Sequence, residues 1–203
     1  MSDSVRRRII RERAVPSIEE FWFMTDHLHL RAAAAELLLN LFVSRRIFSM
    51  TLLRKIQKGA DKQKLWVLYS ADENVRLARC ANAAFAILTQ NVNASHRIFE
   101  GITSRPEVLK EIPMHDDAEA QERGLMPVAN IMESDEKLCS EIIPTELFRV
   151  LIAIAKLEVV NAGRKGAIDH RTDSRCTSAI WAKRGLAAAE KFGIVKPTDR
   201  GAI

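Results

Sequence analysis

The sequence predicts an all-α fold built from stacked helices. Of its 203 residues, 47% are apolar, which allows a sizeable core, while only 8 are Gly and 6 are Pro. Runs that alternate with the period of a β-strand are nearly absent. Apolar, largely alanine-rich stretches recur at Leu30 to Phe42, Ala83 to Gln90 and Gly124 to Met132. Composition and recurrence together favour one helical domain, or one segment of a longer helical repeat protein.

The first predicted helices lead into the stretch from Leu30. Residues 2 to 14 form a charged, arginine-rich helix, and Ser17 with Glu20 has the spacing of a capping box for the next one. The helix from Leu30 carries one continuous apolar stripe, made of Leu30, Ala34, Leu37, Leu38 and Leu41. Ala33, Glu36 and Asn40 lie on a different face of it.

The middle of the chain alternates short and long helices. Residues 44 to 58 could form an amphipathic helix, Asp61 can cap a helix up to residue 71, and Asp72 can cap a longer helix up to Gln90. The second face of that longer helix carries Asn82, Phe85 and Thr89. Two short helices are expected between residues 94 and 112.

The second half is predicted to hold four further helices and a charged loop. A helix over residues 118 to 132 contains Pro127, which should kink it. Ser134 and Asp135 cap a short helix, and Thr145 caps a strongly apolar one. Residues 161 to 173 read as a loop, and the final helix spans residues 174 to 192, before Gly193.

The polar positions of the three apolar stretches predict a repeat. Asn40, Thr89 and Asn130 hold corresponding places, roughly 40 to 50 residues apart, close to the period of armadillo and HEAT repeats. Each unit has short helices before a long one, which is the armadillo order. We therefore expect residues 1 to 203 to form a right-handed armadillo-type α-solenoid of about three to four repeats.

In such a solenoid the long helices line one surface, and this register predicts a partner-binding groove. Its expected residues are Glu36, Asn40, Asn82, Phe85, Thr89, Arg123, Met126 and Asn130. Amide side chains suit a groove that holds an extended peptide, because they both donate and accept hydrogen bonds. The alternative for each asparagine is a polar residue whose hydrogen bonds are satisfied inside the protein.

Charge and reactive residues suggest few other functions. The net charge is +5, and a second basic zone, with Arg45, Arg46, Arg54, Lys55 and Lys58, leaves open a scaffold for RNA or another acidic partner. Solvated helix faces explain the same charges, so nucleic acid is not the expected partner.

No phosphate-binding loop and no cysteine or histidine metal spacing occurs in the sequence, so we expect neither cofactor nor metal. His115, Asp116 and Asp117 form the only compact cluster of histidine and carboxylates, and they are expected to cap a helix, not to catalyse. No signal peptide or membrane span is recognisable, which predicts a cytoplasmic protein. Because no nucleophile with an identifiable base partner is found, we also expect that the protein is not an enzyme.

Several strings also resemble a known family. The segments EEFWFMTDHLHLRAAAAELLLNLF, DKQKLWVLYSADENVRLARCANAAFAILT and GLAAAEKFGIVKP are similar to the UCS-domain myosin chaperones (the uncoordinated, Cro and She proteins). The likeness covers most of residues 6 to 158 and 177 to 197. Residues 44 to 58 and 158 to 177 depart from it.

The resemblance implies an armadillo solenoid whose UCS region binds the myosin motor domain and assists its folding, assembly and stability. The similar region is the C-terminal portion of a UCS domain. Family members bind Hsp90 through a tetratricopeptide domain, and they also have a central armadillo region; neither matches this chain. The resemblance thus implies a myosin-binding chaperone module of the cytoplasm, associated with the sarcomere if it is expressed in muscle.

Overall fold

The computed structural model describes residues 2–42, 69–90, 92, 93, 95, 96, 99, 110–162 and 170–196, with the side chains of residues 42, 157–162 and 170–176 left aside. Within these residues all regular structure is helical. The elements are α1 (Asp3–Arg11), α2 (Val15–Met24), α3 (Leu28–Phe42), α6 (Val75–Leu88), the 3-10 helix η1 (Ile112–Met114), α9 (Ala118–Ser134), α10 (Glu136–Ile142), α11 (Glu146–Ala162) and α12 (His170–Lys191).

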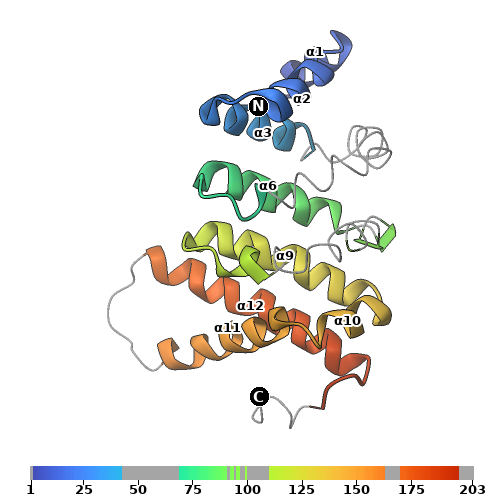
Figure 1. Ribbon diagram of the computed structural model, residues 1–203, viewed down its shortest axis with the longest axis vertical. Coiled ribbons are helices and arrows are strands. Elements are labelled where there is room, and N and C mark those ends of the chain that lie inside the picture. Colours follow the sequence, from blue (N-terminus) through green and yellow to red (C-terminus); the bar gives the residue numbers. More distant parts are fainter. Residues whose placement is uncertain are drawn as a thin grey trace.

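The long helices stack in layers. α3 packs on α6, α6 on α9, and α9 on α12, so that Figure 1 shows them one above another along the long axis. α2 packs on α3, α10 on α9, and α11 on α12. The stack confirms the all-α solenoid predicted from the sequence, and it adds α12 as a layer that the three similar stretches did not include.

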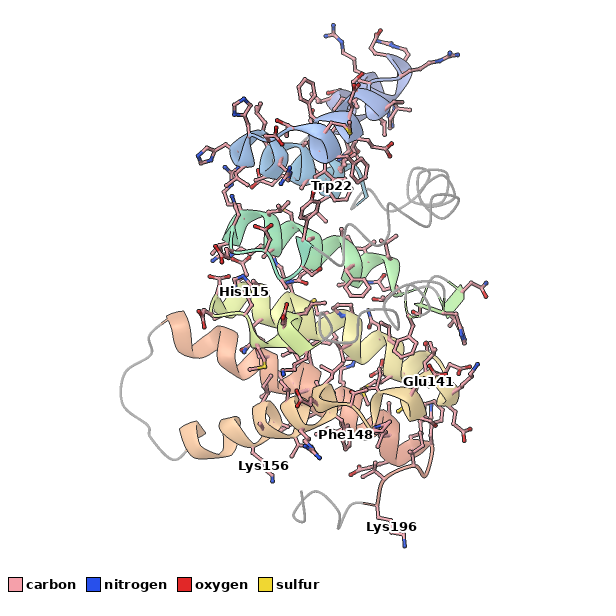
Figure 2. The ribbon with its side chains drawn as sticks, viewed as in Figure 1. Trp22, His115, Glu141, Phe148, Lys156 and Lys196 are labelled. Carbon is pink, nitrogen blue, oxygen red and sulfur yellow. The ribbon has the colours of Figure 1, made fainter. Side chains whose placement is uncertain are left out.

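The core runs through the stack as one continuous apolar cluster. α6 lies between α3 and α9, and nine of its residues are buried. Trp22 on α2 reaches the second layer, because its ring lies 5.9 Å from that of Tyr69, which precedes α6 (Figure 2). The buried face of α3 includes Ala32, Ala35 and Leu38, whereas Leu30 is half exposed. The predicted stripe on α3 was therefore wrong at Leu30, because the buried face is rotated away from it.

Two predicted helix starts need correction. α2 begins at Val15 with Pro16 in its first turn, so the capping box at Ser17 does not form. The side chain of Asn74, not that of Asp72, caps α6 by accepting from the Leu77 N–H at 3.3 Å. α11 begins at Glu146, directly after Thr145 as predicted, and the Thr145 hydroxyl donates to the Ile142 carbonyl at 2.6 Å. Asp135 does cap α10, as predicted.

α9 positions the middle of the stack. It runs as one helix from Ala118 to Ser134 with the buried Pro127 inside it. Its Gly124 lies against η1, where an added Cβ would stand 2.4 Å from Cγ2 of Ile112. A glycine at this place therefore lets α9 and η1 approach closely.

The last two helices are longer than predicted. α11 extends to Ala162 and α12 begins at His170, so the ends of the predicted loop over residues 161 to 173 are helical. Gly193 ends the last helix with φ +72°, and the Ile194 N–H returns to the Ala189 carbonyl at 3.0 Å. The helix expected over residues 44 to 58 lies outside the described residues, as do residues 61 to 68 of the helix expected up to residue 71.

Candidate functional site

The structure separates the eight predicted groove residues into exposed and buried ones. On α3, Asn40 is exposed and Glu36 is half-buried. On α9, Arg123, Met126 and Asn130 are half-buried. The three residues predicted from the middle stretch, Asn82, Phe85 and Thr89, are all buried.

Asn82, Phe85 and Thr89 therefore cannot line an open surface in this structure, which corrects the prediction for these three. Asn82 is 0% exposed, and its amide donates to the carbonyls of Ser70 and Ala120, both at 3.1 Å. Phe85 is 1% exposed and belongs to the core. The physical reason is the position of α6 between two layers, which buries most of its circumference.

Asn130 and Thr89 bind each other across two layers. The Asn130 amide donates to the Thr89 hydroxyl and to the Ala86 carbonyl, each at 3.1 Å. The Thr89 hydroxyl in turn donates to the Phe85 carbonyl at 3.0 Å. For these two residues the structure shows the alternative reading, in which a polar residue is satisfied inside the protein and fastens neighbouring helices.

Charged residues, not amides, run along the exposed face of the stack. The guanidinium of Arg76 on α6 holds the carboxylate of Glu36 on α3 with two hydrogen bonds, 3.0 and 2.8 Å. On the last two layers, Arg184 of α12 holds Glu133 of α9 in the same two-bond geometry, at 2.8 and 2.5 Å. Two-bond pairs fix orientation as well as distance.

Arg79 is the centre of the ion pairs between α6 and α9. It binds Asp117 with bonds of 2.8 and 2.7 Å and also lies 2.7 Å from Glu119. Arg123 pairs with Glu119 and donates to the Arg79 carbonyl. We call this surface the ladder face, defined by Glu36, Arg76, Arg79, Glu119, Arg123, Glu133 and Arg184.

The charges of the ladder face and of Asp117 hold neighbouring helices together. The hydrogen bond from Arg79, opposed by burial and helped by the Ala120 N–H, lowers the pKa of Asp117 to about 2. The pKa of Arg76 is raised, mainly by its hydrogen bond with Glu36. The charged side chains of the ladder face remain between a third and a little over half exposed, so solvent screens each pair and the pairs add little to stability.

The ladder face also presents half-exposed apolar side chains. Met126 on α9 and Trp181 on α12 are half-buried, and the guanidinium of Arg184 lies 4.5 Å from the centre of the Trp181 ring. Tryptophan, arginine and methionine are enriched in protein interfaces. The charged residues of α6 and the charged and aromatic residues of α12 were not predicted, because the repeats were aligned on the polar positions Asn40, Thr89 and Asn130. The pattern that points to the charged residues is the recurrence of opposite charges about one repeat apart.

The cluster of His115, Asp116 and Asp117 is a helix start, as predicted. Asp117 caps α9 by accepting from the Ala120 N–H at 2.9 Å, and the Asp117 N–H donates to Nδ1 of His115 at 3.0 Å. Figure 2 shows His115 between the layers of α6 and α9. Its Nε2 lies 3.2 Å from the Asp72 carbonyl.

The described part of the chain contains no cluster of side chains suited to holding a metal ion. Cys80 and Cys139 are free and buried, and burial raises the pKa of each thiol to about 11. No helix within the described ranges is long and apolar enough to cross a membrane. The second basic zone, with Arg45, Arg46, Arg54, Lys55 and Lys58, lies outside the residues that the structure describes.

Comparison with known proteins finds relatives that match nearly the whole chain. No family model matches the chain. The zebrafish (Danio rerio) unc-45 homolog B is 31% identical over 198 residues, which are 97% of this chain and 19% of the relative. The mouse (Mus musculus) unc-45 homolog B is also 31% identical, over 203 residues and 20% of its length. The chain thus spans about a fifth of the curated relatives it matches.

The solved structures agree with these relatives. An UNC-45 chaperone studied for binding and folding muscle myosin is 53% identical over 94% of this chain and 19% of its own, with a TM-score of 0.78. UNC-45 from C. elegans in complex with an Hsp70 peptide is 49% identical over 90% of this chain and 19% of its own, with a TM-score of 0.67. The fold is thus an armadillo-like solenoid, and the chain is homologous to the UNC-45 family of UCS-domain myosin chaperones, matching about a fifth of their length.

Proposed function

We infer that this chain is a myosin-binding module of a chaperone, which assists the folding and assembly of the motor domain and does not itself catalyse a reaction. The observation that carries the proposal is the 53% identity, with the same fold, to an UNC-45 chaperone that binds and folds muscle myosin. The relatives are about five times longer, so other activities of the family, including contact with Hsp90 or Hsp70, belong to the whole protein and not to this proposal.

The ladder face is the surface that we assign to the motor domain. It continues across four layers, from Glu36 on α3 to Arg184 on α12. Asn40 is exposed beside it, one helical turn from Glu36, and Met126 and Trp181 offer apolar contact between charges. Charged rims with a few larger apolar side chains are typical of interfaces that select a partner by charge and shape.

Co-precipitation of the 203-residue chain with a myosin motor domain tests this proposal. We expect the chain to bind, and we expect Asn40→Lys to weaken binding by about tenfold, because a charge is inserted where a partner must pack. The matched control is Ala153→Lys, which changes an exposed position on α11 by the same charge.

The two substitutions separate the two parts of the proposal. Equal binding by the parent, the Asn40 variant and the Ala153 variant would move the contact away from the ladder face. Absence of any binding by a cooperatively melting parent chain would overturn the myosin-binding function itself.

A further inference from the structure

The outer face of α1 carries a group of arginines that the ladder face does not include. Arg7, Arg8, Arg11 and Arg13 are all exposed, and Arg7, Arg8 and Arg11 lie within one half of the helix circumference. The opposite side of α1 holds Ile9 and Ile10, which are partly buried and pack against the core. α1 is therefore an amphipathic helix whose cationic side faces solvent.

Intramolecular pairing uses little of this charge. Asp3 forms an ion pair with Arg6 at 2.8 Å, and the carboxylate of Glu12 lies 3.6 Å from the guanidinium of Arg11. Within the described part of the chain, neither Arg7 nor Arg8 has an ion-pair partner. Arg8 and Arg11 lie in the last turn of α1, where the helix dipole stabilises positive charge, but this explanation for their presence does not extend to Arg7.

The surroundings of α1 indicate what kind of anion it suits. The next helix, α2, places Glu19 and Glu20 close by in the chain, and Asp26 follows it, all of them at least partly exposed. A long polyanion such as a nucleic acid favours a continuous positive surface, whereas Glu12 lies 3.6 Å from Arg11 at the end of α1 and further carboxylates follow on α2. A short acidic polypeptide can stay on α1 alone.

Exposed apolar side chains on α1 and α2 narrow the choice further. Val5 on α1 is 48% exposed, and Phe21 and Met24 on α2 are 58% and 77% exposed. Figure 1 shows α1 and α2 together at the end of the stack opposite α11. We propose that the cationic face of α1 binds an acidic polypeptide segment that also carries apolar side chains, through Arg7, Arg8 and Arg11.

Fluorescence anisotropy of the full 203-residue chain tests the proposal. The probe is a fluorescein-labelled peptide of repeated Glu-Leu-Leu-Glu units. We expect Arg7→Glu with Arg11→Glu to weaken its binding by about tenfold or more, and Arg7→Gln with Arg11→Gln to weaken it less. Binding should also weaken as salt is added, because the charges are exposed.

The matched control is Arg149→Glu with Lys156→Glu, which reverses two exposed charges on α11. It should change peptide affinity by less than about twofold. Equal losses in the two charge-reversed variants would overturn the assignment to α1. So would equal binding by a peptide with serine in place of leucine, or tighter binding by an oligothymidylate that depends on the same arginines. The glutamine pair keeps the test valid if charge reversal disturbs α1.

Discussion

The amide of Asn130 on α9 donates to the hydroxyl of Thr89, which ends α6, at 3.1 Å. The same amide reaches the Ala86 carbonyl at 3.1 Å, so one side chain ties two layers at two points. Both residues stand at places that the sequence assigned to a partner. Their first role is to hold neighbouring repeats in register, since the bonds they make are internal.

We expect Asn130→Ala to lower the free energy of unfolding by about 1–2 kcal/mol, because it leaves the Ala86 carbonyl and the Thr89 hydroxyl without this donor. Urea denaturation measures the effect. Asn40→Ala is the control, since Asn40 is exposed, and it should cost no more than about 0.5 kcal/mol. Equal costs at the two positions would contradict the inter-layer role.

Gly124→Ala should lower the free energy of unfolding by about 1–3 kcal/mol, because the new Cβ would stand 2.4 Å from Cγ2 and 3.1 Å from the carbonyl oxygen of Ile112. Thermal melting measures the shift. Gly185→Ala is the comparison, since its nearest contact is the flexible sulfur of Met132 at 3.0 Å. A larger loss of unfolding free energy at Gly185 than at Gly124 would contradict this prediction, because it would mean that η1 shifts easily to make room for the new Cβ.

Asp117 should contribute stability that depends on pH. Its pKa is lowered to about 2 in the folded chain, from 3.8. A lowered folded-state pKa gives stability that is present above the unfolded value and lost as pH falls between about 4 and 2. The pair with Arg79 is partly screened by solvent, so we expect roughly 1 kcal/mol at neutral pH.

The measurement compares Asp117→Asn with the parent in urea at several pH values. The difference in unfolding free energy should stay constant from about pH 7 to 5 and narrow below about pH 4. Asp116→Asn, at the exposed neighbouring position, is the matched substitution. A difference that stays constant down to pH 2 would rule out the pairing as its cause.

Cys80 and Cys139 should resist thiol reagents in the native chain, because both are buried and the pKa of each is about 11, so almost no thiolate exists at pH 8. In a Cys176→Ser background, maleimide labelling followed by mass spectrometry should detect little modification until urea is added. Rapid native labelling of either cysteine would mean that its layer opens readily.

Sequence patterns predicted the stack better than they predicted its exposed face. α3, α6 and α9 follow from the alanine-rich stretches, and Asp135 and Gly193 mark helix ends as expected. The register on α6 failed because a helix between two layers buries almost all sides, so amphipathicity no longer identifies an outer stripe. The half-exposed stripe on α6 includes Arg76, Arg79 and Ala83, and the predicted residues Asn82 and Phe85 lie inward of it.

Helix boundaries were missed where side chains have more than one possible partner. Asp72 and Asn74 are both capping residues, and the choice of Asn74 follows from the Asp72 carboxylate accepting from the Asn74 N–H at 2.8 Å. The spacing of opposite charges about one repeat apart marks candidates for the ladder face, but it does not determine which charges pair. Whether Arg79 pairs with Asp117 depends on the rise and rotation from one layer to the next, which helical periodicity does not encode.

Among the described helices, the long ones form their extensive contacts with the next layer in chain order, from α3 to α6, α9 and α12. Such an arrangement has consequences during synthesis. On leaving the ribosome, α6, α9 and α12 each meet the apolar surface of a layer that is already formed, whereas α11 packs on α12, which follows it in the chain. The chain can thereby complete its own folding progressively, one layer at a time.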